Sequence, residues 1–135
     1  MDRLTTKMHG QLDYLSVIVL LLTPRILRWN GKMTNLLTAL AAGTLTYSAI
    51  TKYEWGVTQI LPMRGHLLLD AMSGIFLIMA PKLLRVHNPL YRTALVSFGL
   101  FQIAAASATD LPEEETPEHR SQFVIPVDVE QYVRE

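Results

Sequence analysis

The chain places a histidine and an aspartate four residues apart twice, first at His9 and Asp13 and then at His66 and Asp70. Residues four apart lie on the same face of a helix, so each histidine can pair with its own aspartate. An imidazole beside a carboxylate can share a proton, and the two groups together are ligands that suit Zn, Fe or Mn. These four side chains are therefore the candidates for any chemistry.

Both pairs belong to a repeat with a period of 57 residues. Segments 9–28 and 66–85 align without a gap and share nine of twenty residues. Ser16 and Ser73, three residues after each aspartate, extend the polar face in both copies. Such a period indicates one structural unit built twice. We therefore expect the two His/Asp pairs at equivalent places in two similar halves.

Four apolar segments predict four helices. Residues 33–51 and 93–109 carry no charge over 19 and 17 residues, close to the roughly 20 residues that cross a bilayer. The repeated segments reach that length only when counted from His9 or His66, which places each aspartate about one turn inside the span. A soluble bundle would need charged outer faces, but residues 17–22 and 74–80 are apolar all round.

The predicted fold is all-α: an integral membrane four-helix bundle made of two tandem helical hairpins, in residues 1–109. Repeat one covers about residues 8–51 and repeat two about 65–109. Two helices per repeat give both copies the same orientation, with the symmetry axis along the membrane normal. The two hairpin loops carry six basic residues against four at the other end, which favours a cytoplasmic side for the loops. We expect a multi-pass protein of the bacterial inner membrane, with both termini on the non-cytoplasmic side. The six cations of the loops are Arg25, Arg28, Lys32, Lys82, Arg85 and Arg92.

Residues 110–135 differ from the rest of the chain. They open with an acidic, proline-containing block, which predicts an extended or disordered tail. Apolar residues then alternate with polar ones, as in a strand that pairs with the sheet edge of a partner. The apolar members of this possible partner-binding strand are Phe123, Ile125, Val127 and Val129.

Composition excludes several classes of function. The chain has no cysteine, which rules out thiolate metal sites, disulfides and cysteine nucleophiles. The formal net charge is zero and no basic stripe indicates nucleic-acid binding. We find no phosphate-binding loop, hydrolase elbow or zinc-protease motif. We therefore predict no catalytic residues, no enzyme activity and no cofactor.

The repeated pattern resembles the SPW-repeat family of small bacterial membrane proteins. Each copy reads His-x-x-Leu-Asp, then an apolar helix, then a small residue with proline at its end; Glu54-Trp-Gly-Val and Leu61-Pro-Met join the copies. Residues 23–25 (Thr-Pro-Arg) and 80–82 (Ala-Pro-Lys) stand where the family has Ser-Pro-Trp. The resemblance covers roughly residues 8–108. It implies a multi-helix membrane protein with no established activity and assigns no site residues.

Three functions are compatible with these features. The leading hypothesis is a structural or accessory subunit that binds a membrane-protein partner or a second copy of itself, with the His/Asp pairs as hydrogen bonds between the halves. The alternative is conduction of protons, ions or small solutes through paired intramembrane His and Asp. The second alternative is a metal- or haem-binding membrane protein. Spacing within one helix leaves open whether the two pairs meet.

Overall fold

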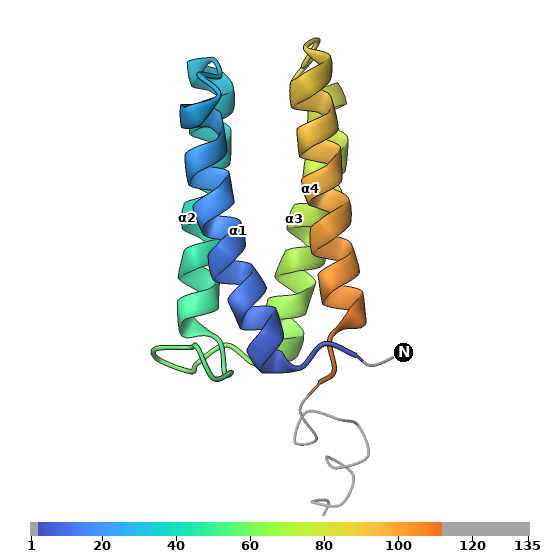
Figure 1. The fold of residues 1–135 in the computed structure, drawn as a ribbon. Coiled ribbons are helices and arrows are strands. Elements are labelled where there is room, and N and C mark those ends of the chain that lie inside the picture. The colour runs from blue at the N-terminus through green and yellow to red at the C-terminus, as the bar shows by residue number, and fades with distance from the viewer. Residues whose placement is uncertain (1–2, 112–135) are drawn as a thin grey trace, which may run out of the picture.

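The computed structural model describes residues 3–111, which form four helices and no strand. The helices are α1 (Thr6–Ile26), α2 (Gly31–Ile50), α3 (Met63–Leu83) and α4 (Pro89–Ala108). The predicted all-α, four-helix architecture is confirmed over this range. The predicted tail strand at residues 123–129 lies outside the described residues. Figure 1 shows the four helices running roughly side by side, with the α1–α2 and α3–α4 loops at one end and the α2–α3 connection at the other.

Local sequence signals set the helix ends. The side chain of Thr5 accepts a hydrogen bond from the backbone N–H of Met8 at the start of α1. Asn30 and Asn88 do the same for the first turns of α2 and α4. Each caps donors that have no partner within the helix. Pro24 and Pro81 lie two residues before the ends of α1 and α3, as the proline positions predict.

The two halves are hairpins that exchange contacts at their ends. α1 packs against α2, and α3 packs against α4 (Figure 1). Leu4 pairs by backbone hydrogen bonds with the end of α4 at Thr109, and Leu61 pairs in the same way with the end of α2 at Thr51. Leu4 and Leu61 are equivalent residues of the two repeats. Each repeat therefore begins by joining the last turn of the other.

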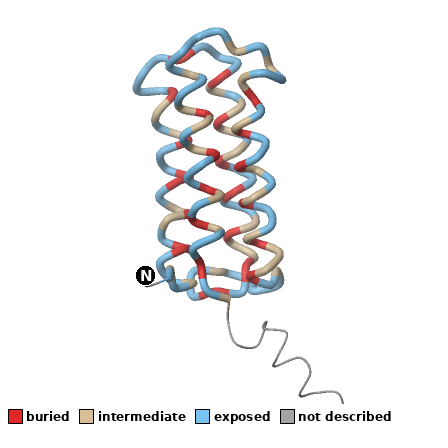
Figure 2. Tube along the Cα trace, turned by 90° about the vertical axis from the view of Figure 1, so that its right-hand side faces the viewer, coloured by how far each residue is buried: buried red, intermediate tan, exposed pale blue. Residues whose placement is uncertain are grey.

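The interior has an apolar zone and a polar zone. Buried positions recur along the helices, with exposed positions between them (Figure 2). On the side of the hairpin loops the core is apolar, and Leu20, Leu77 and Leu95 are almost completely buried there. Toward the other end, polar and charged side chains replace them: His9, Asp13, Ser16, Thr44, Ser48, Thr51, His66, Asp70, Gln102 and Thr109.

Within residues 3–111, one helix, α3, is long and apolar enough by length and composition to cross a membrane. This differs from the sequence-based ranking, in which the charge-free segments within α2 and α4 were the clearest candidates. Threonine, serine and tyrosine residues dilute the apolar content of α2, and Arg92 lies inside every stretch of α4 that is long enough to cross a membrane. Absence of charge and apolar character are different properties: the window at 33–51 meets the first better than the second, whereas the window at 93–109 is apolar but too short.

Candidate metal centre

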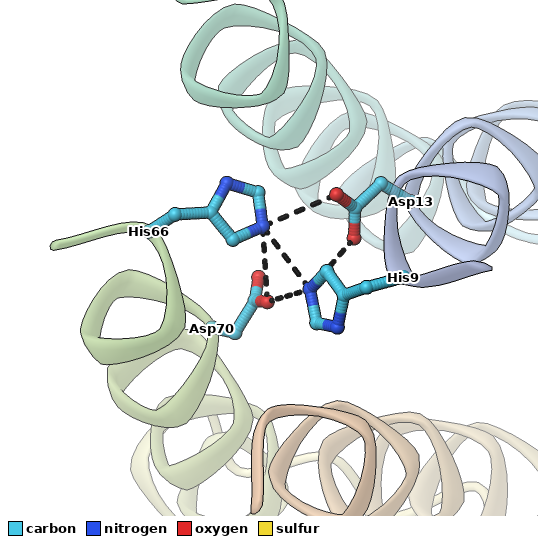
Figure 3. A group of neighbouring side chains, drawn as sticks. All are labelled: His9, Asp13, His66 and Asp70. Atoms are coloured by element: carbon cyan, nitrogen blue, oxygen red, sulfur yellow. Dashed lines mark hydrogen bonds and ion pairs between the residues drawn. The ribbon is translucent and has the colours of Figure 1, made fainter. Parts of the chain in front are cut away.

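The two His/Asp pairs meet at the interface between the two halves. His9 Nε2 lies 3.2 Å from His66 Nε2 and 2.9 Å from Asp70 Oδ2. His66 Nε2 lies 3.1 Å from Asp13 Oδ2. Within each repeat, the distance from Nε2 to the carboxylate four residues later is 3.4 Å for His9 and 3.3 Å for His66. Figure 3 shows all four side chains pointing into one small space between α1 and α3.

All four residues are buried. Both histidines are 0% exposed, Asp13 is 7% exposed and Asp70 is 3% exposed. Each carboxylate therefore contacts the imidazole of the other repeat as well as its own. The sequence predicted the two pairs separately, and the structure brings them together into one group of four, which we call the His/Asp cluster.

Two threonines fix which ring nitrogen carries the proton. His9 Nδ1 lies 2.8 Å from Thr109 Oγ1, and His66 Nδ1 lies 2.8 Å from Thr51 Oγ1. Each threonine hydroxyl already donates its single hydrogen to a backbone carbonyl one turn earlier, at Ala105 and Tyr47 respectively. The hydroxyl must therefore accept from Nδ1–H, so a neutral ring has its lone pair on Nε2. Both lone pairs point into the cluster.

Hydroxyl groups from α2 and the α2–α3 connection hold the carboxylates. The Tyr47 phenol donates to Asp70 Oδ1 at 2.6 Å. Tyr53 and Ser48 donate to Asp13 Oδ2 at 3.1 and 3.3 Å. Burial, together with the Asp13 charge, raises the pKa of the Tyr53 phenol, so this group stays protonated and remains a donor. These bonds orient both carboxylates toward the histidines.

The serines of the repeat have a smaller role. Ser73 donates to the backbone carbonyl of Asp70 and lies 3.1 Å from Gln102 Oε1, which ties α3 to α4. Ser16 is buried beside the cluster, and its hydroxyl has no hydrogen bond to the described residues 3–111. Neither serine contacts the inner atoms of the cluster. The supporting residues Tyr47, Ser48, Thr51, Tyr53 and Thr109 were missed by the sequence analysis.

The α2–α3 connection closes the cluster from the end of the molecule. A Cβ atom added to Gly10 would collide with the rings of Tyr53 and Trp55, so this connection lies directly on α1. Trp55 Nε1 donates to the carbonyl of Lys7, and Tyr14 donates to the carbonyl of Trp55. Glycine at position 10 is therefore required for the close approach of the connection.

Five distances within the cluster are close to the edges of a small tetrahedron. With ligands about 2.0–2.1 Å from a metal ion, tetrahedral geometry places neighbouring ligand atoms about 3.3–3.4 Å apart. The four contacts between nitrogen and oxygen and the one between the two nitrogens span 2.9–3.4 Å, with His9 next to Oδ1 of Asp13 and His66 next to Oδ2. One ligand atom from each residue can be chosen so that all four lie within 4.8 Å of one another. Two imidazoles and two carboxylates of opposite repeats thus surround a common centre.

Comparison with known proteins adds no relative. No family model, curated protein or solved structure matches the chain.

Proposed function

We propose that this protein is a multi-pass membrane protein that binds one divalent transition-metal ion in the His/Asp cluster, where the ion joins the two repeated halves. The observation that carries the proposal is the hydrogen bond from each ring to a threonine, from which the protonation of the rings follows. Each Nδ1–H is bonded to a threonine, which leaves both Nε2 lone pairs facing two carboxylates. Metal-binding histidines use the same arrangement, since the second ring nitrogen donates to an oxygen that fixes the tautomer.

Charge balance supports a divalent ion. Two carboxylates buried with two neutral imidazoles leave two negative charges in an apolar surrounding, which is costly unless cations compensate them. Protonating both rings would set two Nε2–H groups against each other at 3.2 Å. A divalent cation between the four ligands neutralises both carboxylates and uses both lone pairs.

The ligand set indicates the kind of metal. Imidazole nitrogen and carboxylate oxygen suit Zn²⁺, Fe²⁺ or Mn²⁺, and the chain has no thiolate for softer ions. Four buried protein ligands with no ligand position on the surface resemble a structural zinc site, whereas catalytic sites keep a position for water or substrate. We therefore propose a structural role for the ion and, in keeping with the sequence prediction, no enzyme activity.

The surface supports placement in a membrane. Large apolar side chains are exposed along the helices, including Ile18 and Leu22 on α1 and Ile75 and Met79 on α3, each about half exposed. Contiguous apolar surface of this extent is rare on soluble monomers. The helices contain 20 or 21 residues, which corresponds to about 30 Å of length and fits the hydrocarbon thickness. Membership of the SPW-repeat family, the inner-membrane location and the outward termini remain predictions.

Metal binding is favoured over conduction because the polar interior ends partway through the molecule. Past Ser16 and Gln102 toward the hairpin loops, the buried residues belong to the hydrophobic core, among them Leu20, Leu77 and Leu95. A proton or ion path needs polar groups or water across the full span. The role as an accessory subunit for a membrane-protein partner, through residues 123–129, is compatible with a structural metal and remains a prediction.

Metal content of the purified protein tests the proposal. We expect the protein to resist extraction from membranes by alkaline carbonate and to require detergent. After stripping with a chelator and reloading with Zn²⁺ or Mn²⁺, we expect about one tightly bound ion per chain, which raises the melting temperature. His9→Ala and Asp70→Asn should each lose the ion and the stabilisation, whereas His87→Ala, at an exposed residue of the α3–α4 loop, should keep both.

Two results would contradict the proposal. One is a folded, helical protein that takes up far less than one ion per chain under all loading conditions. The other is equal metal content in the His9→Ala and His87→Ala variants. Asp70→Asn is informative if His9→Ala fails to fold, because it preserves the shape of the side chain and removes only the charge.

A further inference from the structure

The ends of α1 and α3 carry arginines in a backbone conformation that disfavours them. Arg28 and Arg85 have φ of 50° and 51°. Each follows the last turn of its helix, and the next residue donates back to a proline carbonyl: Trp29 N to Pro24 O at 2.8 Å, and Val86 N to Pro81 O at 2.9 Å. This helix ending usually has glycine at the left-handed position, because a Cβ atom is strained there. Both repeats nevertheless have arginine.

The strain suggests that the guanidinium group has a use at this place. Within residues 3–111 the side chains of Arg28 and Arg85 have no hydrogen bond or ion pair, so no described residue pairs with their charge. Both are exposed. An exposed cation kept twice in a strained position points to a binding partner outside the chain.

The surrounding surface is strongly cationic. Arg25, Lys32, Lys82 and Arg92 are exposed at the same end of the molecule. The chain has no aspartate or glutamate from residue 14 to 53 or from residue 71 to 109. The carboxylates among residues 3–111 lie at the opposite end of the helices or in the His/Asp cluster, where they cannot balance these charges.

The two loops form one surface. Lys32 Nζ donates to the backbone carbonyl of Leu84 at 3.1 Å, which joins the start of α2 to the end of α3. The rings of Trp29 and Tyr91 pack against each other with centroids 4.6 Å apart and planes tilted by 39°. The backbone N–H of Asn30 donates to the Tyr91 hydroxyl. Arg28 and Arg85 therefore belong to loops that contact each other through a fixed interface.

Apolar side chains surround the cations. Ile26 is 71% exposed and Leu83 is 58% exposed, each two residues before its arginine, and Leu90 is exposed at the start of α4. If a nucleic acid or an acidic protein segment bound here, these three apolar side chains would face polar groups of the partner. A phospholipid supplies both a phosphate for the guanidinium and an acyl chain for the apolar rim.

We propose that the hairpin-loop end is a binding site for anionic phospholipid, at which Arg28 and Arg85 bind the phosphate groups. This site lies at the other end of the molecule from the His/Asp cluster. The inference rests on the membrane placement proposed above, but it does not depend on the metal.

Replacing the two arginines by glycine removes their charge without disturbing the fold. The double variant Arg28→Gly/Arg85→Gly removes both guanidinium groups and relaxes the left-handed residues, so it should fold at least as well as the wild type. Arg28→Asn/Arg85→Asn is a second variant whose residues also tolerate this conformation. Lys7→Gln/Lys52→Gln removes the same charge at the other end and serves as the matched control.

The measurement is lipid binding by the full-length protein in mild detergent. Phosphatidylglycerol should raise the melting temperature of the wild type and of the lysine control, and phosphatidylcholine should not. Native mass spectrometry should show bound phosphatidylglycerol, with at least about tenfold weaker binding in both arginine variants, in line with the loss of two charge-assisted contacts. Their metal content should equal that of the wild type.

Two outcomes would overturn the proposal. One is an unchanged phosphatidylglycerol response in the arginine variants. The other is the same stabilisation of the wild type by inorganic phosphate at equal concentration, which would indicate a site for a soluble anion. His9→Ala separates the lipid site from the metal site. We expect this variant to lose the metal and to keep its binding of phosphatidylglycerol.

Discussion

Asp13 and Asp70 occupy equivalent positions in the two repeats, yet different hydrogen bonds hold their carboxylates. Asp70 receives a short bond from Tyr47 on α2. The residue equivalent to Tyr47 on α4 is Ala105, which has no hydroxyl, and Asp13 instead receives bonds from Ser48 and Tyr53. The two halves thus keep the same four inner groups while the support around them has diverged. Such a pattern is expected when the inner groups share one function and each half needs only to position its own pair.

The helix contacts of the two halves also differ. In repeat two, Gly74 on α3 meets Gly99 on α4 so closely that an added Cβ at Gly99 would lie 2.5 Å from the Gly74 carbonyl oxygen. The equivalent residues of repeat one are Val17 and Ala41. Repeat one therefore accommodates side chains where repeat two requires backbone contact. α3 and α4 form the tighter hairpin.

Gly99→Ala tests this difference between the hairpins and should have the largest effect on stability. It gives repeat two the residue that repeat one has at position 41, but its methyl group would meet backbone atoms of Gly74 and Ile78, which cannot rotate away. We expect the free energy of unfolding to fall by about 2–3 kcal/mol, as for overpacked cores. Reversible unfolding in mixed detergent micelles measures it. Stability equal to the wild type would show that the α3–α4 contact has room for a side chain.

Tyr47→Phe and Tyr53→Phe should sharpen the comparison of the two carboxylates. The Tyr47 hydroxyl donates to Asp70 Oδ1, whereas the hydroxyls of Tyr53 and Ser48 both donate to Asp13 Oδ2. We expect Tyr47→Phe to cost about 1.5–2 kcal/mol and Tyr53→Phe about 0.5–1 kcal/mol, since one carboxylate keeps a second donor. Metal affinity should fall by about tenfold for Tyr47→Phe and less for Tyr53→Phe.

The same unfolding assay, together with a zinc competition titration, measures both variants. A double variant serves as the control, because the two tyrosines act on different carboxylates and their effects should nearly add. Equal losses of stability and metal affinity in Tyr47→Phe and Tyr53→Phe would contradict this expectation. They would mean that neither the length of the hydrogen bond nor the presence of a second donor determines how much each hydroxyl stabilises its carboxylate.

How much of this could be predicted from sequence depends on the helix concerned. The first helices of the repeats share nine residues over twenty positions, and that repeat, with the i, i+4 spacing, was enough to predict the helices and the four residues of the cluster. Their meeting could not be predicted, because spacing along one helix does not fix how the helix is rotated against another. That rotation depends on packing between the halves, including the exchanged contacts of Leu4 and Leu61.

The supporting residues could not be found in the same way. From the start of each second helix to the threonine at its end, α2 and α4 share only Leu37 with Leu95 and Thr51 with Thr109. The extra residue His87 also shifts the period from 57 to 58, so a search at 57 misses both matches. Thr51 and Thr109, which fix the positions of the ring protons, therefore match each other only when the two repeats are aligned with a one-residue insertion. Tyr53 lies outside the repeated helices altogether.

Gly43→Ala should have the smallest effect, and the opposite sign to Gly99→Ala. Gly43 lies on the wall of a groove of about 460 Å³ between α2 and α3, and an added Cβ would meet no atom within 4 Å. The equivalent residue of α4 is Phe101, so repeat two carries a large side chain where repeat one has none. With no contact to disturb, the substitution mainly reduces the conformational freedom of the unfolded chain.

We therefore expect Gly43→Ala to raise the free energy of unfolding by about 0.5–1 kcal/mol, the usual advantage of alanine over glycine within a helix. The pair of variants makes the same chemical change on the second helix of each repeat, so helix propensity cancels between them and the difference isolates packing. If Gly43→Ala instead lowers the free energy of unfolding, the groove between α2 and α3 must be closed around Gly43 in solution. α2 would then approach α3 as closely as α4 does, and the asymmetry between the two halves would be smaller than their glycine contacts indicate.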